Sequence, residues 1–247
     1  MKARAAILFI LLCFLSQSLW AYTGREIIEK SDALPEAKTA KSIVMMLIHQ
    51  GDRVIEKEFT ILSKKFENDE DKTLLSFQKP TRIKLLTHSK KGGDDDQWLR
   101  LSSGKVKRIA SSDKGKSFVN SHFYYEDLNS RDIDDYEYKY IGDETAVGVD
   151  CYKVESIKKA GMKKVYDRAI LYVRKSDFFI VRIDFYQKGE FHKYLENSEI
   201  QKIDNILTPF RVVMSLANGK GRTELKVTSV LYNTEIKSSE FNKEALR

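Results

Sequence analysis

The sequence predicts a mainly β protein, built from one large antiparallel sheet that curls or closes into a barrel and carries a few short helices. Apolar and polar residues alternate along many short segments, which turns one face of each segment to a core and the other to water. Turns rich in Gly, Asn and Asp separate these segments by hairpin-length gaps. We count ten or eleven candidate strands. Strand twist makes a sheet of that size curl.

The N-terminus predicts export from the cytoplasm. Lys2 and Arg4 form a positive start, residues 5–15 an apolar run and residues 19–21 a cleavage site, which together make a secretory signal peptide. The apolar run is short for a membrane-spanning helix, which needs about 20 residues. An uncleaved N-terminal anchor is the alternative. We therefore expect a signal peptide at residues 1–21 and a single domain at residues 22–247.

The remaining elements follow in chain order. Residues 25–33 predict a short helix with Thr23 as its cap, and Pro35 ends it. Residues 117–128 lack alternation and predict a short helix or loop, and residues 239–246 predict a short closing helix with Phe241 on its apolar side. The clearest alternating strand patterns lie at residues 55–61, 73–77, 82–85, 179–186 and 224–231.

Charge and cysteine content narrow the possible partners. The chain has 43 Lys and Arg against 36 Asp and Glu, a formal net charge of +7, and the two signs are interleaved. A nucleic-acid-binding protein gathers its positive charge into a stripe, so we expect no nucleic-acid partner. Mild basicity favours some attraction to anionic lipid head groups. Cys151 is the one cysteine after residue 21, so no internal disulfide is expected, and we predict a buried strand residue there.

No catalytic constellation stands out in the sequence. None of the four histidines has another His or Cys at zinc-ligand spacing, and the sequence contains no GxSxG elbow and no phosphate-binding glycine loop. Asp94-Asp95-Asp96 lacks the alternating ligands of a calcium loop. We therefore expect no enzyme activity, no catalytic residues, no metal and no cofactor. A secreted hydrolase with a site assembled from distant residues is an alternative.

Four segments, taken in their order, resemble a known family. They are residues 25–48, DQWLRLSSGKVKRIASSDKGKSFVNSHFYYEDL (96–128), YIGDETAVGVDCYKVES (140–156) and residues 207–227. Their order resembles the outer-membrane lipoprotein-sorting (LolA-like) proteins, in the branch associated with RND/MMPL-type exporters. The sequence departs from the family pattern at Val119-Asn120, where the family has Met-Gly, and at Ser121-His122, where it has Ser-Asp.

The resemblance implies a half-open, LolA/LolB-like barrel whose short helices cover an apolar cavity. It implies a monomeric periplasmic carrier that shields the acyl chains of a lipid or lipoprotein. Its expected partners are an RND/MMPL-type exporter or the outer membrane, with transient contact to a membrane surface. Helix 25–33 or segment 117–128 would be a movable lid. The inward apolar positions predicted to line the cavity are Phe59, Ile61, Leu75, Phe77, Ile83, Leu85, Val181 and Ile183.

The same family resemblance supports a second function. Envelope-stress regulators also use a LolA-like domain, bound to a membrane-embedded partner, so the fold alone does not fix the role. A periplasmic sensor or interaction module is therefore the alternative to a carrier.

Overall fold

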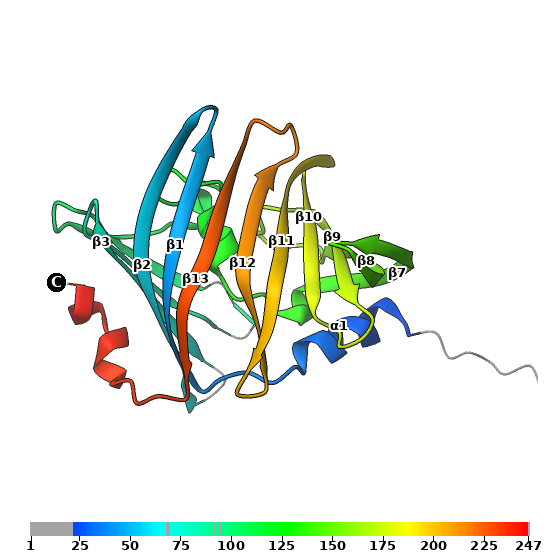
Figure 1. The fold of residues 1–247 in the computed structure, drawn as a ribbon, viewed down its shortest axis with the longest axis horizontal. Helices are drawn as coiled ribbons and strands as arrows, with labels where there is room; N and C mark the ends of the chain where they lie inside the picture. The colour runs from blue at the N-terminus through cyan, green and yellow to red at the C-terminus, as the bar shows by residue number, and fades with distance from the viewer. Residues whose placement is uncertain (1–21, 68–69, 91, 94, 247) are drawn as a thin grey trace, which may run out of the picture.

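The computed structural model describes residues 22–67, 70–90, 92–93 and 95–246, and the predicted signal peptide lies outside these residues. Within them, thirteen strands form one antiparallel sheet in the order β6-β5-β4-β3-β2-β1-β13-β12-β11-β10-β9-β8-β7 (Figure 1). The edge strands β6 and β7 do not pair with each other, so the sheet curls without closing. The predicted fold class is confirmed. The sheet exceeds the ten or eleven predicted strands partly because short strands such as β6 show no alternation.

The element bounds are as follows. The strands are β1 Thr39–Gln50, β2 Arg53–Lys65, β3 Asp71–Lys79, β4 Ile83–His88, β5 Asp96–Arg100, β6 Val106–Arg108, β7 Tyr136–Ala146, β8 Val149–Lys158, β9 Arg168–Arg174, β10 Ile180–Gln187, β11 Glu190–Ile203, β12 Ile206–Leu216 and β13 Gly221–Tyr232. The α-helix is α1 Gly24–Asp32, and the 3-10 turns are η2 Ser111–Asp113, η3 Tyr125–Leu128, η4 Ile133–Asp135, η5 Ser238–Phe241 and η6 Lys243–Leu246.

Helix α1 forms where the sequence predicts it and packs against the β7–β9 end of the sheet. Thr23 caps it, because its hydroxyl accepts a hydrogen bond from the Glu26 amide while the Glu26 carboxylate accepts one from the Thr23 amide. Ile27 and Ile28 are buried among apolar residues of β7, β8 and β9. A Cβ at Gly24 would lie 2.6 Å from the Tyr140 amide nitrogen, so only glycine permits this close approach of helix to strand.

The inner face of the sheet is the one covered by α1 and by residues 109–135, the connection between β6 and β7 that we call the cover segment. Apolar residues of β1 to β5 pack with Ile109, Phe118 and Tyr125 of this segment. Residues of β9, β10 and β12 pack with its Phe123. One connection therefore contacts both halves of the sheet, which curls around it (Figure 1).

The C-terminus covers a different part of the sheet. Its two 3-10 turns bury Phe241 and Leu246 against Leu74, Leu86 and Trp98 of β3, β4 and β5. These three residues alternate with the inner-face residues of the same strands, so the C-terminal turns lie on the outer face. Where the sequence predicts one closing helix, the structure has two short 3-10 turns, and Phe241 is buried as expected of the apolar side. No helix among the described residues has the length and apolar character needed to cross a bilayer.

Candidate functional site

The cover segment contains a tight turn that holds Phe118 against the inner face. Ser117 and Tyr124 form an isolated antiparallel bridge, and the Phe118 amide donates to the Phe123 carbonyl over 2.8 Å. Val119 and Asn120 complete the turn with φ angles of 48° and 64°. A positive φ is costly for a β-branched residue, so surrounding contacts must hold this turn in place. Phe118, which is fully buried, supplies such a contact because its ring packs between Phe77 and Tyr125.

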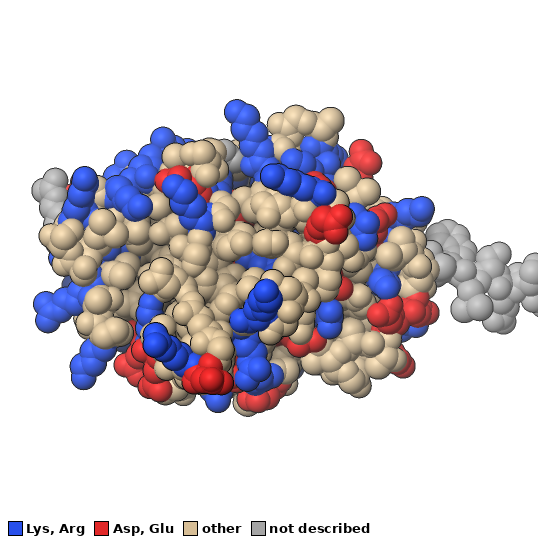
Figure 2. Space-filling model, turned by 90° about the horizontal axis from the view of Figure 1, so that it is seen from above, with Lys and Arg blue, Asp and Glu red and all other residues tan. Residues whose placement is uncertain are grey.

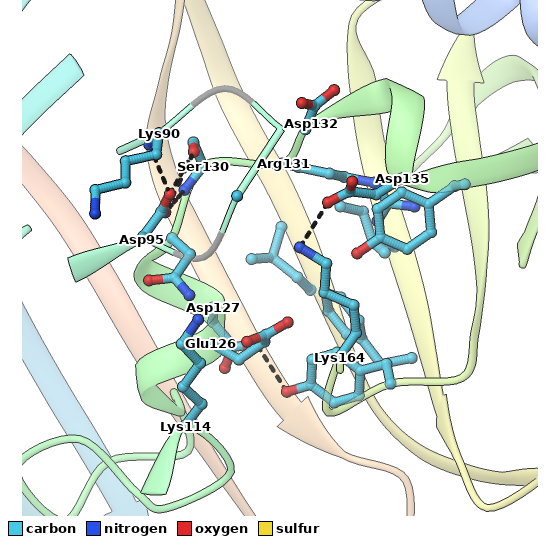
Figure 3. Close-up of a pocket in the computed structure, with 17 residues that line it drawn as sticks. Lys90, Asp95, Lys114, Glu126, Asp127, Ser130, Arg131, Asp132, Asp135 and Lys164 are labelled. Atoms are coloured by element: carbon cyan, nitrogen blue, oxygen red, sulfur yellow. Dashed lines mark hydrogen bonds and ion pairs between the residues drawn. The ribbon is translucent and has the colours of Figure 1, made fainter. Parts of the chain in front are cut away.

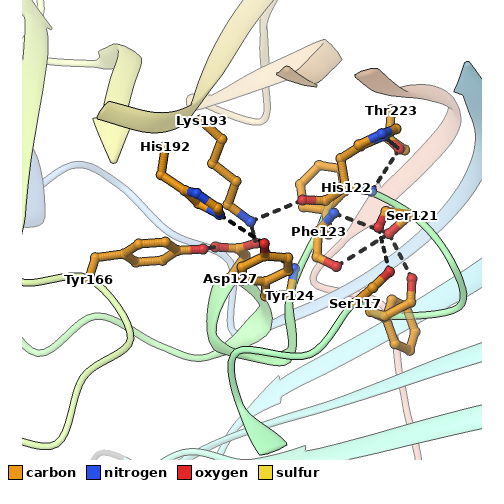
Figure 4. A network of polar contacts seen from close by, with 11 residues as sticks. Ser117, Ser121, His122, Phe123, Tyr124, Asp127, Tyr166, His192, Lys193 and Thr223 are labelled. Carbon is orange, nitrogen blue, oxygen red and sulfur yellow. Dashed lines mark hydrogen bonds and ion pairs between the residues drawn. The ribbon is translucent and has the colours of Figure 1, made fainter. Parts of the chain in front are cut away.

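A buried ion pair fastens the cover segment to strand β11 (Figure 4). The Lys193 Nζ lies 2.6 Å from the Asp127 carboxylate and also donates to the His122 carbonyl over 3.0 Å. Both side chains are almost fully buried, with 0% and 2% exposed. The Tyr166 hydroxyl donates to the other Asp127 oxygen over 2.7 Å, and the Tyr124 amide donates to Asp127 over 2.6 Å. The carboxylate therefore has three donors, which is the condition for a tolerable buried charge.

Burial determines how this network titrates. It lowers the pKa of the Lys193 ammonium group, and the adjacent Asp127 carboxylate opposes that shift. Burial also raises the pKa of the Tyr166 hydroxyl, with Asp127 adding to the effect, so the phenol stays protonated and donates. Lys193 further lies 3.5 Å from the centre of the Tyr124 ring, whose hydroxyl is 2.8 Å from His192.

A second set of contacts joins the cover segment to β13. The amide of His122 donates to the Thr223 hydroxyl over 3.0 Å, and its Nδ1 lies 2.8 Å from the same oxygen. The His122 ring lies so close to Gly221 that a Cβ there would be 2.4 Å from Nε2. The cover segment is thus held to two neighbouring regions of the inner face, on β11 and on β13.

A cavity of about 210 Å³ lies beside this network, between the cover segment and the inner face of β10 and β11 (Figure 3). Ile183, Phe185 and Leu195 form its apolar floor. Charged side chains line its other walls, and several are paired: the Lys164 Nζ lies 2.7 Å from the Asp135 carboxylate. The cavity combines an apolar floor with charged walls. It therefore suits an amphipathic ligand better than a purely polar one.

Two acidic groups of the cavity wall are held in an unfavourable environment. Burial raises the pKa of Glu126 and of Asp95 above their ordinary values. Asp95 is compensated in part, because it accepts hydrogen bonds from the amides of Lys90 and Ser130. The Glu126 Oε2 atom is buried and has no hydrogen-bond partner among the described residues. Glu126 is therefore the wall residue whose buried charge is least compensated by hydrogen bonds.

This buried charge predicts an unusual pH dependence. A carboxyl group with a raised pKa binds more protons in the folded than in the unfolded state, between its ordinary pKa of 4.5 and its raised pKa. Its contribution to stability therefore increases as the pH falls through that window. We expect Glu126→Gln to raise the melting temperature at pH 7. Lowering the pH should then raise the melting temperature of this variant less than that of the unaltered protein.

Melting curves at pH 7 and pH 5 test this, with Glu137→Gln as the control because Glu137 is exposed. Equal responses of the two variants would show that Glu126 carries no burial cost.

The structure distributes the eight predicted cavity residues over three places. Six belong to one packed cluster under Phe118, at the β1–β5 end of the inner face. They are Phe59, Ile61, Leu75, Phe77, Ile83 and Leu85. Ile183 lies on the floor of the cavity at the other end. The eight residues therefore do not share one location, and their role in ligand binding stays a prediction.

Val181 lies on the outer face, contrary to the predicted alternation of β10. It packs with Ile170 and Tyr172 on β9, whereas Ile183 packs with inner-face residues. The cause is a register shift between Ile180 and Arg182 in the pairing of β10 with β9. A β-bulge inserts one extra residue, which changes the face to which the following side chains point.

Sequence reasoning missed the central residues of the site. Phe185 and Leu195 follow the alternation of their strands, and this alternation could have placed them on the inner face. Lys193 lies two residues before Leu195 and therefore on the same face, so the sequence also places a charged residue at an inward position. Its partner Asp127 stands 66 residues earlier in a segment without a pattern.

The residues with metal or nucleophilic potential are not gathered into a site. Among the described residues, no group of three His, Cys, Asp or Glu side chains could hold a metal ion. Cys151 is a buried strand residue, as predicted, and burial raises the pKa of its thiol.

Solved structures with the same architecture define the class of the protein. The chain is similar to a DUF1329 family protein from Desulfovibrio piger, with 29% identity, a TM-score of 0.86, and 91% of this chain and 98% of the other covered. It is similar to a putative outer membrane lipoprotein-sorting protein domain from Vibrio parahaemolyticus, with 27% identity, a TM-score of 0.85, and 90% and 97% covered. A LolA superfamily protein from Nitrosomonas europaea shares the fold, with 19% identity, a TM-score of 0.70, and 91% and 100% covered.

These likenesses show that the chain has a LolA-like fold, and the predicted resemblance is confirmed. A family model described as "Uncharacterized protein"-like matches residues 69–247, and the chain belongs to that family. A search of curated proteins finds no match. The association with RND/MMPL-type exporters stays a prediction.

Proposed function

We propose that this protein is a periplasmic carrier that binds the acyl chain of a lipid or lipoprotein between the cover segment and the inner face of β10 and β11. The observation that carries the proposal is the cavity with the apolar floor of Ile183, Phe185 and Leu195, inside a LolA-like fold. Each buried methylene contributes about 0.8 kcal/mol. An acyl chain covered by such a floor is therefore spared about that cost for each methylene while it crosses water between membranes.

The size of the cavity implies that the described state is the closed one. Its volume of about 210 Å³ is below the range of about 300–1,000 Å³ that ligand pockets occupy. A full acyl chain requires the cover segment to move away from β10 and β11. Segment 117–128, which the sequence predicts as a lid, belongs to this cover segment, whereas α1 packs against the β7–β9 end of the sheet.

Cargo exchange then depends on contacts that can break and re-form. The cover segment is tied to the sheet by the Lys193–Asp127 ion pair and by the contact of His122 with Thr223. A carrier needs moderate affinity so that it can deliver its cargo to an exporter or to the outer membrane. Export through residues 1–21 and exchange with an RND/MMPL-type partner belong to this proposal.

Displacement of a fluorescent fatty acid from delipidated protein tests the proposal. We expect saturable binding that the double variant Ile183→Gln/Leu195→Gln weakens at least about tenfold, because two polar side chains on the floor remove the apolar contact. The matched control is Val54→Gln/Ile157→Gln, which alters two exposed residues and should bind normally. A folded, lipid-free protein without saturable binding would contradict the carrier and favour a sensor or interaction module.

A further inference from the structure

The antiparallel order of the strands brings six connections to one edge of the sheet. Neighbouring strands run in opposite directions throughout, so the turns after β1, β3, β5, β8, β10 and β12 all lie at the same edge. The turn between β1 and β2 is adjacent to the one between β12 and β13, because Gln50 pairs with Gly221. Figure 1 shows these two hairpins side by side at the top of the molecule.

This edge, which we call the basic rim, is strongly positive. It comprises residues 51–55, 79–82, 101–107, 158–167, 188–191 and 217–222. These six segments contain twelve Lys or Arg residues and three acidic residues, a net charge of +9 that exceeds the +7 of the whole chain. Figure 2 looks onto the upper end of the molecule, where Lys and Arg side chains project around much of the outline.

The positive charge of the basic rim is not neutralised within the protein. Lys164 pairs with Asp135, but the other eleven basic residues form no ion pair with any part of the chain that the structure describes. At the opposite edge, several charged residues are paired: Asp96 with Lys90, Asp143 with Lys175 and Asp177 with Arg174. Unpaired charges at one edge project a field into solvent, whereas paired charges largely cancel.

Exposed apolar side chains lie among these charges. Of the ten exposed large apolar residues in the described part of the chain, five belong to the basic rim or directly precede one of its segments. They are Val54, Ile55, Val106, Ile157 and Phe191. Val54 stands next to Arg53, and Val106 lies between Lys105 and Lys107. Apolar side chains at turn tips, flanked by cations, match the boundary between head groups and acyl chains of a bilayer.

We propose that the basic rim docks this protein onto an anionic phospholipid surface. The cationic side chains contact the phosphate groups, while the exposed apolar side chains enter the upper part of the leaflet. Docking fixes the orientation of the molecule, with the basic rim toward the membrane. The inference stands apart from the carrier proposal, because it depends on the charge and apolar residues of the rim and not on the cavity.

Flotation of the purified protein with vesicles tests the proposal. One set contains equal parts of phosphatidylglycerol and phosphatidylcholine, and the other contains phosphatidylcholine alone. We expect binding to the anionic set only, and its loss when salt rises from about 0.1 M to 1 M, which shortens the Debye length from about 10 Å to 3 Å. The variant Arg53→Glu/Lys220→Glu/Arg222→Glu should bind at least about tenfold more weakly.

A second triple variant separates the rim from net charge. Lys38→Glu/Lys202→Glu/Lys237→Glu changes the total charge by the same amount, but these exposed residues lie at the opposite edge. It should retain binding. Equal losses in both triple variants, unchanged binding in the rim variant, or no preference for anionic vesicles would each overturn the proposal. Phe191→Ser/Val54→Ser should weaken binding and leave its salt dependence in place.

Fatty-acid displacement on the rim variant keeps the two proposals distinguishable. We expect the rim variant to bind fatty acid normally while failing to float with anionic vesicles. A protein that floats but binds no fatty acid would contradict the carrier alone.

Discussion

Lys193→Met is expected to lower the free energy of unfolding by about 3–5 kcal/mol, the cost of leaving one partner of a buried ion pair without the other. Asp127 would keep its hydrogen bonds from Tyr166 and the Tyr124 amide but lose its counter-charge. Methionine matches the length of lysine closely enough to fill the space. The loss would therefore come from the uncompensated carboxylate and not from a cavity. Urea denaturation followed by tryptophan fluorescence measures it.

Two further variants show whether the charge is responsible. Lys193→Met/Asp127→Asn removes both charges and should recover at least half of the lost stability, since an amide can still accept the Tyr166 hydrogen bond. Lys153→Met breaks the exposed pair with Glu144 and should cost less than about 1 kcal/mol. A cost for Lys193→Met as small as that of Lys153→Met would show that the pair does not hold the cover segment.

The prediction of the fold succeeded where local sequence determines structure. In β2, β3 and β4 the alternation gave the correct inner face, because these strands pair in regular register over most of their length. The N-cap of α1 was equally local, since Thr23 and Glu26 are three residues apart. Each of these features depends on the order of neighbouring residues.

The features that sequence reasoning missed depend on contacts between distant residues. The bulge at Val181 arises from pairing with β9, and nothing in the composition of β10 marks it. The cavity depends on the path of the cover segment, whose contacts to β11 and β13 span 66 and 101 residues. The basic rim became visible only when the strand order brought six separate turns to one edge. Interleaved charges in the sequence were therefore compatible with strong segregation in space.

Phe77→Ala is expected to cost about 3–5 kcal/mol of stability, the usual loss when a fully buried aromatic side chain is removed. Phe77 is 2% exposed, stacks on Phe59 with ring centres 4.7 Å apart, and contacts Phe118 of the cover segment. The sequence predicts that Phe77 lines a lipid cavity, whereas its surroundings are those of a filled core. Chemical denaturation gives the cost, and Phe191→Ala is the matched control with a small expected effect, because Phe191 is 39% exposed.

The same variant separates a core from a binding surface. If Phe77 belongs to the core, Phe77→Ala is less stable than the unaltered protein but, under conditions where it is folded, binds fatty acid with undiminished affinity. Ile183→Gln/Leu195→Gln should show the opposite pattern, because Ile183 and Leu195 form the floor of the cavity. Unchanged stability together with weaker fatty-acid binding in Phe77→Ala would move the acyl-chain site to the β1–β5 end of the inner face. The cover segment would then have to release Phe118 before any chain could enter.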